Sequence, residues 1–366
     1  MLQTLVTTTP LARLRGALTT NHPALDGLFV TQPENRAYVS GFTGSYGYLL
    51  VTKDEAVLFT DGRYIEQAQA QAPGWAVVRL QRPYEEALMA ALKRLDVQRL
   101  GFESDHLSHA DYASWTQKLP SIEWKPTIGI VAQLRRYKTP QEVAAIRQAV
   151  AIVDNAFATL LNFLRPGLTE RQVAAELEYA MRRGGADAVA FETIVVSGAR
   201  GALPHGRPED KEIEAGDLVT IDFGARYAGY NSDITRTVFV GGGKQPTDRQ
   251  REIYTLVQQV QQAGVEAVRP GVKCSAVDQL CRNMFEQAGL ADYFVHGLGH
   301  SLGREVHEFP MLVATDDTLI EPGLVLTVEP GLYIKEWGGV RIEDDLCVGE
   351  NGTEVLSRTT RELILL

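Results

Sequence analysis

Four carboxylates in this 366-residue sequence interrupt segments that otherwise alternate like apolar strands. Asp222 and Asp233 flank a turn near residues 226–230, and Glu329 and Glu343 flank a second turn near residues 335–339. Because side chains alternate between the two faces of a strand, each carboxylate is expected to point away from its apolar neighbours. Unpaired carboxylates in such strands would suffer desolvation and mutual repulsion, so a cation must hold them.

That cation could be an arginine or a metal ion. Arg226, Arg236 and Arg341 lie near the carboxylates in sequence. For any one carboxylate taken alone, an ion pair or a solvated strand face is the favoured interpretation. Four carboxylates in two matched hairpins favour a metal site instead.

Histidines strengthen the metal interpretation. The chain has seven, and three of them, His296, His300 and His307, fall within residues 296–307 among several glycines. A lone histidine is more often a core or surface residue than a ligand. Three histidines among glycines, which let the backbone approach closely, indicate a functional segment. The pattern alone leaves open whether His296 or His300 is the ligand.

Other hydrolytic and nucleotide-binding chemistries lack their markers. The sequence has no HExxH zinc helix, no Walker A loop and no GxSxG elbow. The glycines of residues 297–303 miss the dinucleotide fingerprint by one residue and follow no clear strand-to-helix unit.

The predicted ligand set is rich in oxygen and has no thiolate, which suits Mn(II), Co(II) or Zn(II). Four carboxylates are neutralised by two divalent ions, whereas one ion would leave the site strongly anionic. We therefore expect a two-metal site in which a bridging water loses its proton near neutral pH and becomes the nucleophile.

Composition narrows the class of protein. A formal net charge of -10 and a pI near 5.3 disfavour nucleic acid and anionic membranes as partners. The first residues lack the pattern of a signal peptide, and no run approaches the roughly 20 apolar residues that span a bilayer. Cys274 and Cys281 lie seven residues apart and are expected to be buried as small hydrophobic side chains. With Cys347 the cysteines are odd in number and form no CxxC motif, so we expect a reducing, cytoplasmic location.

Two domains are expected, with a boundary in the polar, proline-marked stretch near 126 to 138, and we assign them residues 1–130 and 131–366. The first reads as a small α/β unit with strands at Tyr48 to Thr52 and Ala56 to Thr60 and a helix at Glu85 to Leu95. The second is predicted to contain helices near 141–164, 169–184, 248–268 and 274–288, and strands near 193–197 and 217–240. A helix-rich stretch precedes each carboxylate hairpin, which suggests an internal duplication.

The motifs Asp222-Phe-Gly, Asp233-Ile-Thr-Arg-Thr, His296-Gly-Leu-Gly-His300, Glu329-Pro-Gly and Val340-Arg-Ile-Glu343-Asp together resemble the pita-bread metallopeptidases. This family includes prolidases (Xaa-Pro dipeptidases), aminopeptidase P and methionine aminopeptidases. Residues 59–64 resemble the creatinase-like N-terminal domain of the first two, which methionine aminopeptidases lack. The resemblance implies an α/β (α+β) fold class, in which a small creatinase-like α/β domain precedes a pita-bread domain with internal pseudo-twofold duplication.

The resemblance also implies roles for the residues. Asp222 would bind one metal, Asp233 and Glu343 would bridge both, and His300 with Glu329 would hold the other. Glu329 would also carry the proton from the bridging water to the leaving nitrogen. The remaining implied site residues are His205 near the scissile bond, His307 at the substrate carbonyl, His296 beside the proline, and Tyr333 and Arg341 supporting the ligands.

The predicted function is hydrolysis of the Xaa-Pro bond, with a dipeptidase preferred. Its cofactors would be two divalent ions, Mn(II) first and Co(II) or Zn(II) as alternatives. Its substrate would be a small peptide with proline in the second position, and kinship predicts a homodimer. The alternatives are an aminopeptidase P acting on longer peptides and, in another class, a metal-free binding module or a creatinase-like amidinohydrolase.

Overall fold

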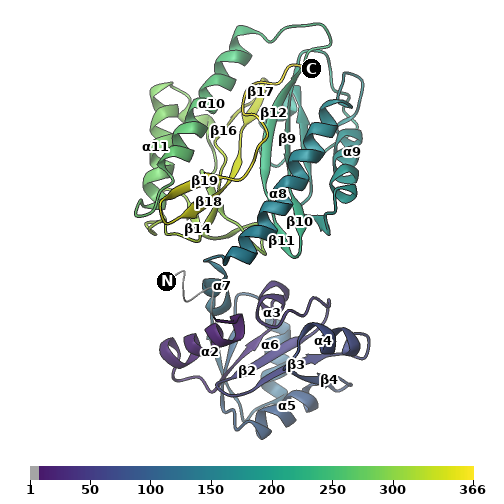
Figure 1. The fold of residues 1–366 in the computed structure, drawn as a ribbon, viewed down its shortest axis with the longest axis vertical. Coiled ribbons are helices and arrows are strands. Elements are labelled where there is room, and N and C mark those ends of the chain that lie inside the picture. Colours follow the sequence, from purple (N-terminus) through teal and green to yellow (C-terminus); the bar gives the residue numbers. More distant parts are fainter. Residues whose placement is uncertain (1–7) are drawn as a thin grey trace. The chain divides into compact units, whose positions relative to one another are not determined.

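The computed structural model describes residues 8–366, which form one compact unit that ends at Arg135 and another that spans Arg136–Leu366 (Figure 1). The predicted absence of a signal peptide concerns residues that lie largely outside the described part. The first unit extends past the predicted limit at residue 130 because helix α7 (Ile130–Arg135) packs within it. There the Tyr38 hydroxyl donates to the Leu134 carbonyl at 2.8 Å, and Arg135 donates to the Asn35 side chain at 2.6 Å.

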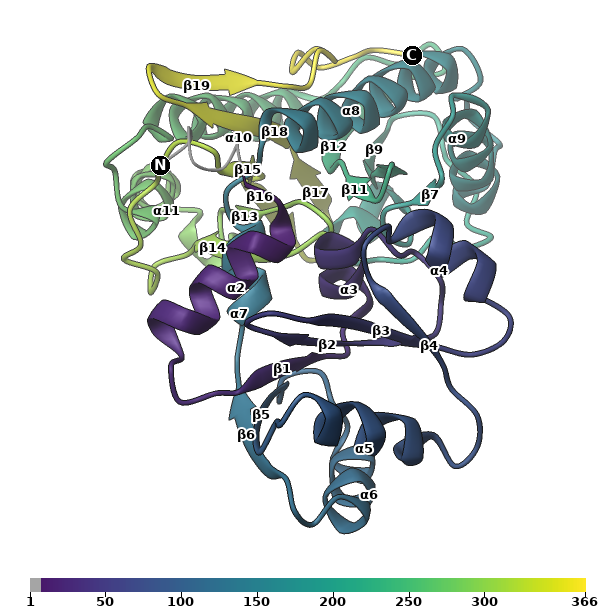
Figure 2. The same ribbon diagram turned by 60° about the horizontal axis from the view of Figure 1, so that its bottom comes forward.

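The first unit is a mixed six-stranded sheet in the order β4-β3-β2-β1-β5-β6, covered by helices on both faces (Figure 2). Separate apolar cores lie on the two faces, one against α2, α3, α4 and α7 and the other against α5 and α6. Strands β2 and β3 have the bounds that the sequence predicts. The elements are β1 (Gly27–Val30), β2 (Tyr48–Thr52), β3 (Ala56–Thr60), β4 (Ala76–Arg79), β5 (Arg99–Glu103), β6 (Glu123–Thr127), α2 (Pro10–Asn21), α3 (Pro33–Ser40), α4 (Ile65–Gln71), α5 (Tyr84–Arg94) and α6 (His109–Lys118).

The second unit begins with two helices that pack against a three-stranded sheet in the order β12-β9-β8. Capping boxes at Thr139 and Thr169 start the two helices by satisfying their first free N–H groups. The elements of this half are α8 (Pro140–Leu161), α9 (Glu170–Arg183), β7 (Ala188–Val189), β8 (Ile194–Ser197), η1 (Gly198–Ala202), β9 (Asp217–Phe223), β10 (Ala225–Tyr227), β11 (Tyr230–Asn231) and β12 (Ile234–Val240).

Two further helices then precede a five-stranded sheet in the order β14-β13-β15-β18-β19 and the hairpin β16-β17. Both halves therefore place a helix pair before a carboxylate-bearing hairpin. The elements are α10 (Asp248–Ala267), α11 (Cys274–Gln287), η2 (Ala291–Tyr293), β13 (Gly299–Ser301), β14 (Glu308–Leu312), β15 (Val325–Val328), β16 (Gly331–Ile334), β17 (Gly338–Arg341), β18 (Asp344–Gly349) and β19 (Gly352–Val355).

Helix α8 is long and apolar enough to cross a membrane by length and composition, which the sequence analysis did not anticipate. Its buried face, including Ile146, Val150, Val153 and Phe157, packs into the cores of this unit, as expected of the core helix of a globular domain. Cys274 and Cys281 are fully buried in the core of the second half.

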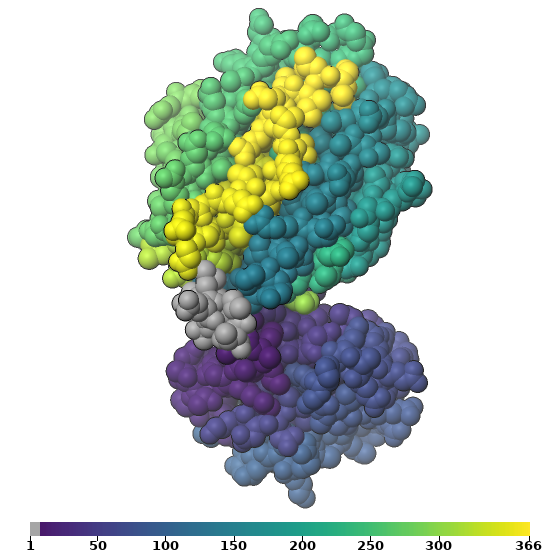
Figure 3. Space-filling view, in the orientation of Figure 1, coloured from purple at the N-terminus to yellow at the C-terminus, as the bar shows by residue number. Residues whose placement is uncertain are grey.

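The last residues of the chain connect the two halves of the second unit. In Figure 3 they form a yellow band between the helices of the first half and those of the second. Asp154 of α8 accepts hydrogen bonds from the backbone of Arg358 and Thr359, and the Tyr254 hydroxyl of α10 donates to the Arg361 carbonyl at 2.9 Å. The two half-sheets are thus held against each other from outside.

Candidate metal centre

Strands β9 and β12 present the first two carboxylates. Val219, Ile221 and Phe223 are fully buried in the core, so Asp222 points from the opposite face of β9, as alternation predicts. Asp222 lies opposite Thr235 in the ladder, and Asp233 precedes β12 by one residue. Both side chains line one cavity of about 630 Å³ in the second unit.

The other three predicted ligands come from the second half. His300 lies on β13, Glu329 follows β15, and Glu343 lies between β17 and β18. Glycine is required beside the histidine, because a Cβ on Gly299 would stand 2.1 Å from the Thr327 carbonyl oxygen. This close approach lets the Thr327 hydroxyl accept a hydrogen bond from the His300 backbone at 3.0 Å.

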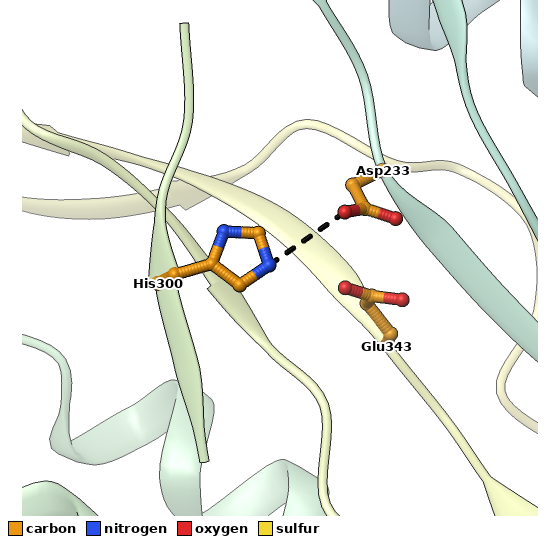
Figure 4. Close-up of side chains that lie close together, drawn as sticks. All are labelled: Asp233, His300 and Glu343. Carbon is orange, nitrogen blue, oxygen red and sulfur yellow. Dashed lines mark ion pairs between the residues drawn. The ribbon is translucent and has the colours of Figure 1, made fainter. Parts of the chain in front are cut away.

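The five predicted ligands converge, although they come from distant parts of the sequence. Figure 4 shows Asp233, His300 and Glu343 pointing toward one another, and each offers a ligand atom within 4.8 Å of the others. His300 Nε2 also lies 3.3 Å from Glu329 Oε1 and 3.7 Å from Asp233 Oδ2. Asp222 and Glu329 complete the group on the wall of the same cavity.

The carboxylates lack sufficient positive charge from the protein. Burial, together with the charges of neighbouring carboxylates, raises the pKa values of Asp233 and Glu343 well above their usual range. Burial also acts to raise the pKa of Glu329, but the hydrogen bond and charge of His300, together with the charges of His296 and Arg341, lower that pKa to about 2. Ionising Asp233 and Glu343 beside the ionised Glu329 is therefore unfavourable, and bound cations would offset that cost.

Arginine side chains neutralise only part of the negative charge of these carboxylates. Arg341 Nη2 donates to Asp222 Oδ2 at 2.7 Å, whereas Arg236 pairs with Asp344 instead. The second oxygen of Asp222, Oδ1, is buried without a hydrogen-bond partner. An unpartnered carboxylate oxygen in a group with three more carboxylates and an imidazole fits divalent metal ions.

Tyr333 and Arg341 form a chain of hydrogen bonds behind the ligands. The Tyr333 hydroxyl lies 2.8 Å from His296 Nε2 and accepts from Arg341 Nη1 at 2.7 Å. Arg341 Nε donates to Thr235 Oγ1 at 3.0 Å, and Thr235 in turn donates to Glu343 Oε2 at 2.6 Å. His296, which the sequence pattern left as a possible ligand, thus uses Nε2 toward Tyr333, while His300 directs Nε2 at the carboxylates.

The two remaining predicted residues lie at the open side of the cavity. His205 and His307 are both exposed and line it. The rings of His300 and His307 are 4.4 Å apart between centroids and nearly perpendicular, so His307 lies directly beside the predicted ligand. Burial lowers the pKa values of His296 and His307, which favours neutral imidazoles.

Sequence reasoning missed one buried acid next to the ligands. Asp345, fully buried, accepts a hydrogen bond from the Asp233 backbone at 2.9 Å. Its signal was present in the run Glu343-Asp344-Asp345, three successive acids in an apolar strand. The first two belong to the motif Val340-Arg-Ile-Glu343-Asp, and Asp345 lies just beyond it.

Comparison with known proteins identifies the family. Residues 144–350 match metallopeptidase family M24, and residues 10–137 match the creatinase/prolidase N-terminal domain. The chain belongs to metallopeptidase family M24. This confirms the family and the fold class that the sequence motifs indicate, and members of this family use divalent metal ions.

Similar proteins cover almost the whole chain. An Xaa-Pro dipeptidase from Pyrococcus furiosus is 40% identical over 93% of this chain and 96% of its own length. The structure of an Xaa-Pro dipeptidase from Bacillus anthracis is 43% identical, covers 98% of this chain and 99% of its own, and has a TM-score of 0.93. An X-Pro aminopeptidase from Thermotoga maritima is 33% identical, with coverages of 97% and 99% and a TM-score of 0.89.

Proposed function

We propose that this M24 metallopeptidase hydrolyses the Xaa-Pro bond of dipeptides. The observation that carries the proposal is the convergence of Asp222, Asp233, His300, Glu329 and Glu343 in one cavity. Relatives that match nearly the full chain are named Xaa-Pro dipeptidases, which supports the choice of substrate.

The ligands divide between two ions by the roles that the family motifs imply. Asp222 would chelate one ion, Asp233 and Glu343 would bridge both, and His300 with Glu329 would hold the second. Bound divalent ions supply Lewis acidity and lower the pKa of water. We propose Mn(II) as the physiological metal, since an oxygen-rich set without thiolates suits it, with Co(II) and Zn(II) as alternatives.

Glu329 is suited to move the proton. By the role that the family motif implies, the Glu329 carboxylate would accept a proton from water and donate it to the proline nitrogen. This step matters because that nitrogen carries no hydrogen in the peptide bond and leaves as a secondary amine.

The histidines act on the substrate. On the open side of the cavity, His307 can donate a hydrogen bond to the carbonyl oxygen as negative charge develops on it, and His205 would contact the substrate near the scissile bond. His296, held by Tyr333, would line the proline side. The first two residues would thus affect turnover, and His296 would affect the choice of substrate.

Cleavage of aminopeptidase P substrates is a second candidate, favoured by one feature of the cavity. Holding a dipeptide requires a cation for its C-terminal carboxylate. Among the cavity residues that the structure describes, the arginines are Arg207 and Arg341. Arg341 is occupied by Asp222 and Tyr333, and Arg207 is exposed and paired with Glu192 at 3.0 Å. Both of these arginines thus already have acidic partners, which favours a longer peptide whose carboxylate lies outside the cavity.

Peptide length separates these candidates. Purified protein loaded with Mn(II) should cleave Ala-Pro and Gly-Pro, and an Asp222→Ala variant should lose this activity together with bound metal. Asp210→Asn, at an exposed carboxylate paired with Arg171, is the matched control and should retain both. Rapid cleavage of Ala-Pro-Ala would establish the aminopeptidase instead, and unchanged activity of Asp222→Ala would refute both.

We further propose a cytoplasmic homodimer that acts without nucleic acid or membrane. The acidic balance of the chain and its unpaired cysteines support the location, and the family resemblance supports the dimer. Size-exclusion chromatography with light scattering tests the oligomeric state.

A further inference from the structure

A buried ion pair lies behind the loop that carries His307. Lys138 Nζ and Glu308 Oε2 are 3.0 Å apart, and their side chains are only 1% and 5% exposed. Burying two charges costs desolvation energy, and replacing such a pair by apolar residues is often neutral or stabilising. A contribution to stability therefore does not by itself explain why this ion pair is buried.

Glu308 organises the loop between β13 and β14. Its Oε1 accepts the backbone N–H groups of Arg304 and Glu305 at 3.1 and 3.2 Å. The loop closes tightly around this carboxylate, since a Cβ on Gly303 would stand 2.8 Å from one of its oxygens. The conformation of the residues just before His307 thus depends on where the Glu308 carboxylate lies.

Lys138 fixes that carboxylate from outside the loop. Its Nζ also donates to the Arg136 carbonyl at 3.1 Å and lies 3.4 Å from Ser301 Oγ, on the strand that carries His300. Its backbone N–H donates to the Gly323 carbonyl at 2.8 Å. Lys138 is therefore anchored at both ends, and it connects the strand that bears His300 with Glu308, the first residue of β14, which directly follows His307.

The register between β13 and β14 places the ion pair of Lys138 and Glu308 next to His307. Ser301 lies opposite Glu308, and the register shifts between His300 and Ser301. At this irregularity the ring of His307 comes to 4.4 Å from that of His300. Bulges commonly re-aim side chains beside active sites, and here the bulge lies next to the ion pair.

We propose that Lys138 and Glu308 are positioning residues that hold His307 over the metal centre, and that they act on turnover through His307 alone. This inference rests on the proposed function, in which His307 contacts the substrate carbonyl. Neither residue lines the cavity.

A double-mutant cycle with His307 tests the inference. Glu308→Gln keeps the shape of the side chain and weakens the pair, and it should lower kcat on Ala-Pro by roughly ten- to a hundredfold with KM and bound Mn(II) little changed. In a His307→Ala background the same change should cost less than about twofold, because its target is absent. An equal loss in both backgrounds would overturn the proposal.

Glu170 provides a matched control. It is a fully buried carboxylate that accepts the backbone N–H groups of Ser197 and Glu209 and pairs with Arg200 at 3.1 Å. Glu170→Gln should lower thermal stability, and any effect on kcat should be the same factor with or without His307. If Glu308→Gln fails to fold, Gly303→Ala displaces the same carboxylate without removing its charge, and the same cycle applies.

A second readout does not depend on activity. In the Zn(II)-loaded protein, the NMR signal of the His307 ring, assigned by its loss in His307→Ala, should shift in Lys138→Met and Glu308→Gln but not in Glu170→Gln. An unmoved His307 signal would refute positioning even if wild-type protein cleaves Xaa-Pro bonds. Moved signals in a protein without this activity would sustain positioning while refuting the proposed function.

Discussion

Replacing Asp233 by asparagine should stabilise the metal-free protein while abolishing metal binding. Asp233 lies in a buried cluster with Glu343 and His300, where burial and neighbouring carboxylates raise its pKa. Asparagine keeps the shape and cannot ionise. The metal-free protein would therefore lose a repulsion, whereas the metal site would lose a bridging ligand.

Geometry sets the size of the gain. Ligand atoms of Asp233 and Glu343 lie within 4.8 Å of each other, and two like charges at that distance repel by about 3 kcal/mol at an effective dielectric constant near 20. Losing the attraction to His300 Nε2, 3.7 Å away, reduces the gain. We expect the free energy of unfolding to rise by roughly 1 to 3 kcal/mol at neutral pH.

The gain should depend on pH. The pKa of Asp233 is raised in the folded state, so the wild-type protein has its full stability below the unfolded pKa of about 4 and loses it as the pH rises through the folded pKa. Asparagine does not titrate. The difference between the variant and wild type should therefore be small near pH 4 and increase toward neutrality.

Urea denaturation in EDTA, from pH 4.5 to 8, measures this difference. The control is Asp210→Asn, an exposed carboxylate whose loss should change stability by less than about 0.5 kcal/mol. Adding Mn(II) should reverse the order, because a ligand at 100 times its Kd stabilises the wild type by about 2.7 kcal/mol. A metal-free Asp233→Asn protein less stable than wild type at pH 7.5, or a difference that does not change with pH, would refute the reasoning.

Three further predictions concern the hydrogen bonds behind the ligands. Arg341→Lys cannot reproduce the bonds to Asp222 and Tyr333, so calorimetric titration should show metal affinity reduced by roughly 10- to 100-fold. Thr235→Val removes the hydroxyl that donates to Glu343 and should weaken metal binding about tenfold in the same titration, with Thr235→Ser retaining most of it. Tyr333→Phe removes the buried hydroxyl that accepts from Arg341 Nη1 and contacts His296 Nε2. It should lower the free energy of unfolding by about 1 to 3 kcal/mol in urea, and an unchanged midpoint would contradict this.

Local pattern was sufficient for most of the fold in the second unit. The predicted helix near 248–268 matches α10, because its apolar spacing and the capping box at Thr247 are both encoded within a few residues. Alternation along β9 likewise predicted which face carries Asp222. These features depend on neighbours in sequence, so one sequence suffices to find them.

Features that depend on distant residues were not predictable in this way. His296 and His300 are four residues apart and fall on the same face of an extended chain, so period two cannot choose between them. Only the tertiary structure shows that one meets Tyr333 and the other meets Glu329. Lys138 and Glu308 are separated by 170 positions, and neither has a local signal of pairing.

The division of the ligands between two half-sheets has a kinetic consequence. Asp222 and Asp233 belong to one half and His300, Glu329 and Glu343 to the other, while the C-terminal band joins both from outside. An ion bound between them would act as a cross-link, and parting of the halves would pull its ligands away. The exchange rate of bound metal should then follow the opening of this seam, and a variant that loosens the band, such as Asp154→Ala, should release metal faster without changing a single ligand.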